Sequence, residues 1–344
     1  MSDTASPSAT PSEPSRHFPG KPRVVVTRRL LPSVEARMSE LFDVTLNTSD
    51  RVMSREDLIA AMQNCEVLVP TVTDRIDEAM IAAGGDSLGL IASFGAGTDH
   101  IDVAAAWRRR IIVTNTPGVF TEDTADTAMA LILTGPRRFA EGIATLRQGE
   151  WPGWGPSFML GHRIGGKQLG IIGMGRIGQA VAHRARAFGL DIVYHNRHQL
   201  PEAVENMLGA RYEPDLDRLL AQSDILTVHC PATAETYHLL DARRIGLMKP
   251  NAFLVNTARG NIIDEEALID ALTNRRIGGA GLDVYTGEPN IDPRFVALPN
   301  VLALPHMASA TIEGREASGE KVITNIRFWA DGHRPPDQVL EGLV

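Results

Sequence analysis

The stretch "LGIIGMGRIGQA", residues 169–180, holds three glycines within six positions: Gly173, Gly175 and Gly178. Apolar residues precede the glycines, and a run typical of a helix begins inside the motif. Glycine weakens regular secondary structure, so the presence of three glycines here needs a physical explanation. In a strand–turn–helix unit the first glycine makes the tight turn, the second lets a pyrophosphate approach the backbone, and the third lets the helix pack closely. The pattern therefore predicts a dinucleotide-binding turn.

The residues about 20 positions beyond the first glycine bear on which dinucleotide is bound. A carboxylate normally stands there and binds the adenosine ribose. This chain has Asn196, Arg197 and His198 instead. A carboxylate would repel a ribose 2′-phosphate, whereas the Arg197 guanidinium would pair with one. We therefore predict NADPH as the cofactor. NADH is the alternative if Arg197 is only a surface residue.

Strand-like and helix-like segments alternate on both sides of the motif, which predicts parallel sheets covered on both faces. Between Gly166 and the last long helix we count six strand candidates. Ser54, followed by Glu56 and Asp57, has the pattern of a helix start. Residues 121–149 read as a helical stretch that Pro136 kinks or breaks.

Composition limits the classes of function. A chain of 344 residues is long enough for two domains, and its net charge of −8 argues against a nucleic-acid binder. The two cysteines and the scattered histidines have no metal-ligand spacing, so we expect no metal and a reducing, cytoplasmic location. No apolar stretch is long enough to span a membrane. Residues 1–20, rich in Ser, Thr and Pro, read as a disordered tail.

Charged side chains follow three later strand candidates, and ligands of open parallel sheets bind beyond the carboxyl ends of the strands. Arg259 follows "AFLVNTA", Asp283 and Glu288 follow "GAGL", and His306 follows "VLALP". Arg259 can clamp a carboxylate, and His306 can donate a proton to a carbonyl oxygen. Glu288 can bond the other imidazole nitrogen and favour the imidazolium. An arginine, a glutamate and a histidine at these strand ends together predict reduction of a 2-oxo acid by hydride transfer.

Longer stretches carry a resemblance to a known family: "GIIGMGRIGQAVA", "SDILTVHCPATAETYHLL", "NTARGNIIDEEAL", "GAGLDVYTGEP" and "LPHMASAT". Together they resemble the D-isomer-specific 2-hydroxyacid dehydrogenases, and among these the glyoxylate/hydroxypyruvate reductases. The resemblance implies an α/β fold of two doubly wound parallel-sheet domains. A Rossmann dinucleotide domain, residues 121–309, would be inserted into a flavodoxin-like substrate domain, residues 21–120 and 310–344.

The resemblance also implies roles for individual residues. Arg259 would be the substrate clamp, Glu288 the partner of histidine, and His306 the general acid/base, giving reduction of glyoxylate or hydroxypyruvate to the D-2-hydroxy acid. Family members are typically homodimers, and Trp151 and Trp154 would lie in an arm that reaches the neighbouring subunit. The remaining implied contacts are the backbone N–H groups of Ala96 and Gly97 on the substrate carboxylate, Arg176 and Ile177 on the phosphates, Thr257 and Ala258 along the cofactor cleft, and Asp283 near the nicotinamide carboxamide.

Two departures narrow this interpretation. The stretch "HNRHQLPEAVENM" is similar to part of the NAD-dependent formate dehydrogenases of the same superfamily. Those enzymes carry Asp where Asn196 stands and Gln where Glu288 stands, and both differences argue against formate oxidation, which needs no proton donor. Two alternatives stay open: a reductase for a bulkier 2-oxo acid, and a non-catalytic dinucleotide-sensing protein of the same family.

Overall fold

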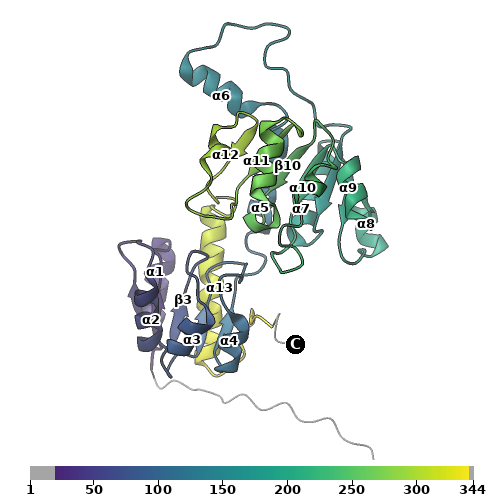
Figure 1. Ribbon diagram of the computed structural model, residues 1–344. Coiled ribbons are helices and arrows are strands. Elements are labelled where there is room, and N and C mark those ends of the chain that lie inside the picture. The colour runs from purple at the N-terminus through teal and green to yellow at the C-terminus, as the bar shows by residue number, and fades with distance from the viewer. Residues whose placement is uncertain (1–19, 341–344) are drawn as a thin grey trace, which may run out of the picture. The chain divides into compact units, whose positions relative to one another are not determined.

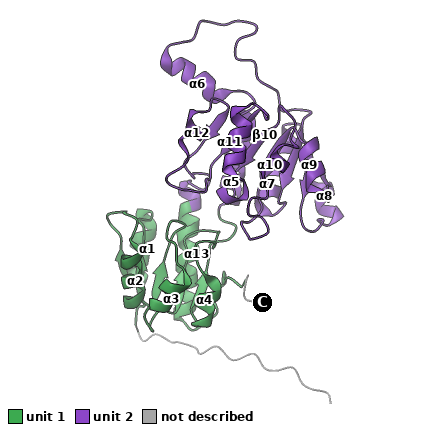
Figure 2. Ribbon diagram, in the orientation of Figure 1, with its two compact units in different colours: residues 1–119, 315–344 green, residues 120–314 purple. Residues whose placement is uncertain are grey.

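A computed structural model describes residues 20–340, which fall into two compact units (Figure 2). Unit 1 runs through residue 119 and resumes at residue 315, and unit 2 comprises residues 120–314. The tail predicted over residues 1–20 lies, except for Gly20, outside the described residues.

Unit 1 is built on a five-stranded sheet with the order β2-β1-β3-β4-β5, all parallel. Helices lie against both faces of this sheet, as the alternating sequence predicts. The strands are β1 (Arg23–Val26), β2 (Asp43–Leu46), β3 (Val67–Val69), β4 (Leu90–Ala92) and β5 (Ile112–Thr114). The helices are α1 (Pro32–Leu41), α2 (Arg55–Asn64), α3 (Glu78–Ala83), α4 (Val103–Arg108) and the greater part of α13 (Ile312–Ala330).

Local sequence determines where α2 begins. The Ser54 side chain accepts a hydrogen bond from the Asp57 amide, and the Asp57 carboxylate accepts one from the Ser54 amide. This reciprocal arrangement satisfies two amide donors that would otherwise lack partners in the first turn. The helix then buries Leu58 and Met62 against the sheet. The helix start predicted at Ser54 is confirmed.

Helix α13 brings the end of the chain back onto the first sheet. Its apolar side chains Val322, Ile323, Ile326 and Trp329 are buried in one cluster with residues of β1, β3 and β4. The opposite face of the sheet is covered by a second cluster that includes α2, α3 and α4. Unit 1 therefore depends on a segment that follows unit 2 in the sequence, which is the insertion that the resemblance implies.

Unit 2 is built on a seven-stranded parallel sheet with the order β12-β11-β10-β9-β6-β7-β8. The strand order reverses between β6 and β9, and nucleotides bind at such a switch point in open α/β sheets. The strands are β6 (Gln168–Ile172), β7 (Asp191–His195), β8 (Ala210–Tyr212), β9 (Ile225–Val228), β10 (Phe253–Asn256), β11 (Gly279–Leu282) and β12 (Val301–Ala303). The edge strand β8 is an addition to the six predicted strands, because three residues are too few to show a period.

The helices of unit 2 pack two buried clusters, one on each face of the sheet (Figure 1). They are α5 (Thr121–Thr134), α7 (Arg176–Ala187), α8 (Glu202–Leu208), α9 (Leu216–Gln222), α10 (Ala242–Ile245), the 3₁₀ turn Gly260–Ile262, α11 (Glu265–Thr273) and α12 (Pro293–Ala297). Helix α6 (Phe139–Gln148) contributes to neither cluster. The parallel α/β fold expected from the sequence is confirmed in both units.

The helical stretch predicted over 121–149 is two helices, α5 and α6, separated by a turn that contains Pro136. Helix α6 buries none of its residues. Together with the chain that follows it, α6 stands away from the rest of unit 2 (Figure 1). We call residues 139–160 the arm. Within residues 20–340, no helix is both long and apolar enough to cross a membrane.

Candidate active site

The glycine turn joins β6 to α7 and is shaped by two close approaches of backbone. Gly173 has a φ of +96°, and a Cβ there would lie 2.5 Å from the amide nitrogen of Cys230. A Cβ on Gly178 would collide with the carbonyl oxygen of Gly173. By contrast, a Cβ on Gly175 would meet no atom within 4 Å. The first and third glycines are thus required by the protein itself, and the second borders open space.

The residues around this turn fit a dinucleotide. Arg176 and Ile177 form the first turn of α7, where no side chain caps the helix, and a helix N-terminus attracts phosphate. The Thr257 hydroxyl oxygen, just after β10, is buried and has no hydrogen-bond partner within the described chain. A buried polar atom without a partner costs free energy, which a ligand contact would recover. Ala258 follows Thr257, and its amide donates to the Asn256 side chain.

Asn196 and Arg197 differ in how they are held. The Asn196 Oδ1 accepts the Met174 amide proton at 2.8 Å, and its backbone carbonyl accepts the Tyr212 hydroxyl at 3.0 Å. Asn196 therefore braces the glycine turn. Arg197 and His198 are exposed beyond it. The pKa of Glu235 lies below its ordinary value, mainly because of a hydrogen bond with Thr233 but also because of the positive charge of Arg197.

The imidazole of His306 and the carboxylate of Glu288 form a hydrogen-bonded pair. The Nδ1–Oε2 distance is 2.6 Å, and the other carboxylate oxygen accepts the Tyr285 amide proton at 2.7 Å. Burial raises the pKa of Glu288, but the bonds from His306 and Tyr285 and the charge of Arg259 outweigh it, so the pKa stays below its usual value. Both side chains remain about one-third exposed, at 30% and 33%. The Glu288 carboxylate is thus ionised, and the pair is open to a ligand.

Asp283 holds the backbone that carries His306. It is fully buried, and its two oxygens accept the amide protons of Met307 and Ala308 at 2.8 and 2.9 Å. Burial raises the pKa of Asp283, and these two hydrogen bonds partly offset that effect. His306 itself has a φ of +52°, which is strained for a residue with a side chain. The two bonds to Asp283 stabilise the turn just after this strained residue.

Arg259 is held by a tight turn at the end of β10. The Asn256 side chain donates to the Arg259 carbonyl at 2.9 Å and accepts from the Ala258 amide at 3.0 Å. Gly260 has no room for a side chain, because a Cβ there would collide with the backbone of Tyr285. This close approach joins the turn of Arg259 to the loop that leads to Glu288.

The structure therefore brings Arg259, Asp283, Glu288 and His306 together, on the connections that follow three neighbouring strands, β10, β11 and β12. Ala96 and Gly97 follow β4 and belong to unit 1. Their place beside the substrate stays a prediction. Trp151 and Trp154 lie on the arm and are exposed.

Sequence reasoning missed three supports of this site: the Asn256 side chain, the close approach of Gly260, and the Tyr285 amide. Only Gly260 gave a local signal, as a glycine directly after a charged residue. His229 bonds the Thr227 hydroxyl at 2.8 Å, and burial lowers its pKa to about 3. Residues 20–340 contain no group of three or more His, Cys, Asp or Glu placed to bind a metal ion.

A nucleotide-type sheet whose strand ends also carry an imidazole hydrogen-bonded to an ionised carboxylate defines the class: a dinucleotide-dependent oxidoreductase. Residues 129–308 match the model of the D-isomer specific 2-hydroxyacid dehydrogenase NAD binding domain. The chain belongs to the D-isomer-specific 2-hydroxyacid dehydrogenase family. The resemblance stated from the motifs is confirmed.

Relatives match almost the whole chain. Glyoxylate reductase of Thermococcus litoralis is 42% identical over 328 residues, which cover 94% of this chain and 98% of that protein. A solved protein of Thermus thermophilus is 40% identical with a TM-score of 0.85, covering 92% of this chain and all of the other. The NADPH-dependent glyoxylate/hydroxypyruvate reductase of Sinorhizobium meliloti, solved with NADP and malonate, is 36% identical with a TM-score of 0.83 and coverages of 94% and 98%. The protein is thus a dehydrogenase-type enzyme with a nicotinamide dinucleotide cofactor.

Proposed function

We propose that the protein uses NADPH to reduce a small 2-oxo acid, glyoxylate or hydroxypyruvate, to the D-2-hydroxy acid. The observation that carries this proposal is the hydrogen bond of 2.6 Å between His306 and Glu288, on the sheet edge that also carries the glycine turn. A carbonyl reduction requires a proton at the oxygen as well as a hydride at the carbon. An imidazole paired with an ionised carboxylate is suited to hold that proton.

Each residue of the site has a separate task. Glu288 bonds Nδ1 of His306 and favours the imidazolium, which leaves Nε2 to donate a proton to the substrate carbonyl oxygen. Arg259 binds the substrate carboxylate through its guanidinium fork. The backbone N–H groups of Ala96 and Gly97 share that carboxylate. Bound NADPH would supply the hydride. Closure of the site around the substrate would exclude water and fix this orientation.

The cofactor contacts follow the same edge of the sheet. The N-terminal turn of α7, with Arg176 and Ile177, would receive the pyrophosphate above Gly175, where the structure leaves space. Arg197 would pair with the ribose 2′-phosphate, supported by the exposed positions of Arg197 and His198 and by the absence of a carboxylate at Asn196. Thr257 and Ala258 would line the cleft, and Asp283 would lie near the nicotinamide carboxamide while it braces His306.

The exposed arm supports a homodimer as the working form, and the two free cysteines support a cytoplasmic location. Large apolar side chains on a projecting segment favour burial against another surface. Trp154, 85% exposed, and Trp151 would then reach towards the neighbouring subunit. The other exposed apolar residues of the arm are Phe139, Ile143, Leu146, Phe158 and Leu160.

A substrate panel assayed with both cofactors tests the proposal. We expect the highest kcat/KM for glyoxylate or hydroxypyruvate with NADPH, and lower values for phenylpyruvate and for sugar-derived 2-oxo acids. A preference for the bulky acids would favour the larger-substrate reductase instead. Normal NADPH binding without turnover of any 2-oxo acid would favour a dinucleotide sensor.

A further inference from the structure

A cavity of about 510 Å³ opens in unit 2 on the edge of the sheet opposite the candidate active site. Its lining includes Lys167, Asp224 and Asn300, which directly precede β6, β9 and β12. Arg138, which directly precedes the arm, and Leu160, at the end of the arm, complete the wall. Because all seven strands are parallel, this amino-terminal edge faces away from the strand ends that carry His306. The cavity is therefore a separate site.

The lining of this cavity carries an excess of positive charge. Two carboxylates, Glu141 and Asp224, face five permanent cations, so three positive charges are left over in a chain whose net charge is −8. The chain has four lysines, and two of them line this one cavity. A concave surface with charge of one sign concentrates ligands of the opposite sign. The five cations are Arg138, Arg163, Lys167, Lys249 and Arg275.

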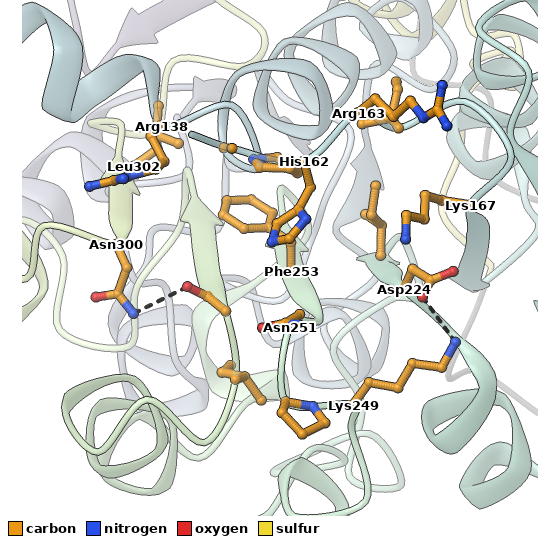
Figure 3. Close-up of a pocket in the computed structure, with 18 of the residues that line it drawn as sticks. Arg138, His162, Arg163, Lys167, Asp224, Lys249, Asn251, Phe253, Asn300 and Leu302 are labelled. Atoms are coloured by element: carbon orange, nitrogen blue, oxygen red, sulfur yellow. Dashed lines mark hydrogen bonds and ion pairs between the residues drawn. The ribbon is translucent and has the colours of Figure 1, made fainter. Parts of the chain in front are cut away.

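One side of the cavity is formed around Asp224 (Figure 3). Its Oδ1 accepts from the Lys249 ammonium at 2.9 Å, and its Oδ2 accepts the Gln168 amide proton at 2.9 Å. Burial raises the pKa of Asp224, but these bonds and the nearby charge of Lys167 leave it below its ordinary value. Both oxygens of Asp224 already have a partner. Lys167 acts on this carboxylate only through space, so its hydrogen-bond donors are left for a ligand.

The other side repeats this arrangement around Glu141. Arg138 donates to both oxygens of Glu141, at 2.9 and 2.6 Å. The Arg138 hydrogen bonds are the main reason that the pKa of Glu141 is lowered, and the charge of Arg275 adds to them from a distance. Glu141 is satisfied by Arg138, so Arg275 remains available. Within residues 20–340, Arg163 and Lys167 form no ion pair.

Two of these arginines stand in strained backbone. Arg138 has a φ of +57° and Arg275 a φ of +51°, in the left-handed region where glycine is normally favoured. A side chain in this conformation costs free energy, so glycine would be the less strained choice at both positions. Both positions instead carry arginines that line the cavity.

Apolar groups lie between the two charged sides. Figure 3 shows His162 near the centre of the cavity, with Arg138 and Asn300 to one side and Lys167, Asp224 and Lys249 to the other. Phe253, Leu302 and Ile225 contribute the apolar part of the lining. His162 is fixed by its amide, which donates to the Pro136 carbonyl at 2.8 Å. The cavity can therefore hold a short carbon skeleton between two anionic ends.

We propose that this cavity is a second ligand site, which binds a small organic polyanion with carboxylate or phosphate groups towards Lys167, Lys249 and Arg163 on one side and towards Arg275 on the other. Arginine forks bind both kinds of group bidentately, and lysines add point charges. A ligand that contacts both ends of the arm and the sheet would also hold the base of the arm in place.

Lysine acetylation locates such a ligand, because only four lysines can react. The full chain, saturated with NADPH, is treated with a limiting amount of N-hydroxysuccinimidyl acetate, and each site is quantified by mass spectrometry. The reactions contain citrate, pyrophosphate, or sodium chloride at equal ionic strength. A bound anion protects in proportion to occupancy, so at about ten times Kd the acetylation of Lys167 and Lys249 should slow about tenfold. Lys21 and Lys321, in unit 1, should be unaffected. The probe that slows acetylation more shows whether the site prefers carboxylate, as in citrate, or phosphate, as in pyrophosphate.

A double substitution distinguishes ligand binding in the cavity from a general effect of the protein's positive charge. We expect Arg163→Gln with Arg275→Gln to abolish most of the protection while both reporter lysines remain. Arg51→Gln with Arg211→Gln removes the same charge from exposed positions elsewhere and should leave the protection intact. Thermal unfolding without ligand checks that each variant folds. Equal acetylation of Lys167 and Lys249 with each probe and with chloride would overturn the proposal. Full protection in the variant Arg163→Gln with Arg275→Gln would also overturn it. The same holds if Lys167 and Lys249 are unreactive without ligand because another surface covers them.

Discussion

The glycine turn after β6 and the connections that follow β10, β11 and β12 lie on one edge of one sheet, yet they are built from different parts of the chain. The turn contributes backbone groups. Gly173, Gly175 and Gly178 lie within six consecutive positions and expose main-chain amides without side chains. The other region offers side chains, with Arg259, Glu288 and His306 contributed by three separate connections.

Because of this difference, the two halves of the site should be disrupted by different changes. Backbone amides do not titrate, so the attraction of a helix N-terminus for phosphate does not depend on the protonation of any protein side chain. A carboxylate and an imidazole depend on their ionisation and on each other. Substitutions in one region should therefore leave the other intact, and only the side-chain region should respond to pH.

Replacing His306 by Ala should produce the largest effect. We expect kcat on glyoxylate to fall by about 10²–10⁴, because the substrate oxygen loses its proton donor. The Kd of NADPH, measured by fluorescence titration, should stay the same because the glycine turn is untouched. A variant that keeps wild-type kcat would show that the proton comes from another group.

Removing the positive charge beside the turn should have a smaller and more selective effect. We expect Arg197→Gln to lower kcat/KM for NADPH by about 10- to 100-fold, the size of one or two lost bonds to a charged group. The value for NADH should hardly change. Arg211→Gln, on the neighbouring edge strand β8, is the matched control and should alter neither. Equal losses with both cofactors would contradict a contact with the 2′-phosphate.

Two alanine substitutions in the turn should separate stability from binding. Gly173→Ala places a Cβ 2.5 Å from the Cys230 amide nitrogen at a φ of +96°, and strain of this kind costs about 1–3 kcal/mol of unfolding free energy. Gly175→Ala meets no atom, so denaturant unfolding without cofactor should change by less than about 0.5 kcal/mol. Its NADPH affinity should nevertheless fall. Normal affinity in Gly175→Ala would mean that the pyrophosphate lies elsewhere.

Replacing Glu288 by Gln should reduce kcat less than replacing His306 by Ala does. We expect a decrease of about tenfold, the value of one hydrogen bond to a charged group. The alkaline limit of the kcat/KM profile should move to lower pH, because an amide no longer favours the imidazolium. A purely structural role for Glu288 would lower activity without moving that limit.

Acid should remove the contribution of Glu288 to stability, and this is the smallest effect that we predict. The folded-state pKa of its carboxyl lies below the ordinary value of 4.5. The ionised carboxylate therefore stabilises the fold above about pH 4.5, and this contribution is lost as pH falls through the lower folded-state pKa. The difference in Tm between the wild type and Glu288→Gln should shrink below pH 4.5. A difference that stays constant with pH would contradict an ionised Glu288 carboxylate.

Much of the fold could be predicted from the sequence because its signals are local. The glycine spacing predicts the β6–α7 turn, and the Ser54–Asp57 pattern predicts the start of α2, since each involves residues only a few positions apart. Strand β8 could not be predicted. It has three residues and pairs only with β7, so its extended form depends on its neighbour rather than on its own pattern.

The sequence by itself determined the nucleotide-binding turn, the alternation of strands and helices, and the kinds of side chain that follow the strands, because these are properties of contiguous residues. Only the tertiary structure decided that Glu288 bonds His306, that Asp283 braces the turn after it, and that five cations surround one cavity at the opposite edge. Those arrangements depend on the order β12-β11-β10 and on contacts between distant segments. Such contacts form only when the whole core is packed, so no short stretch of the chain encodes them.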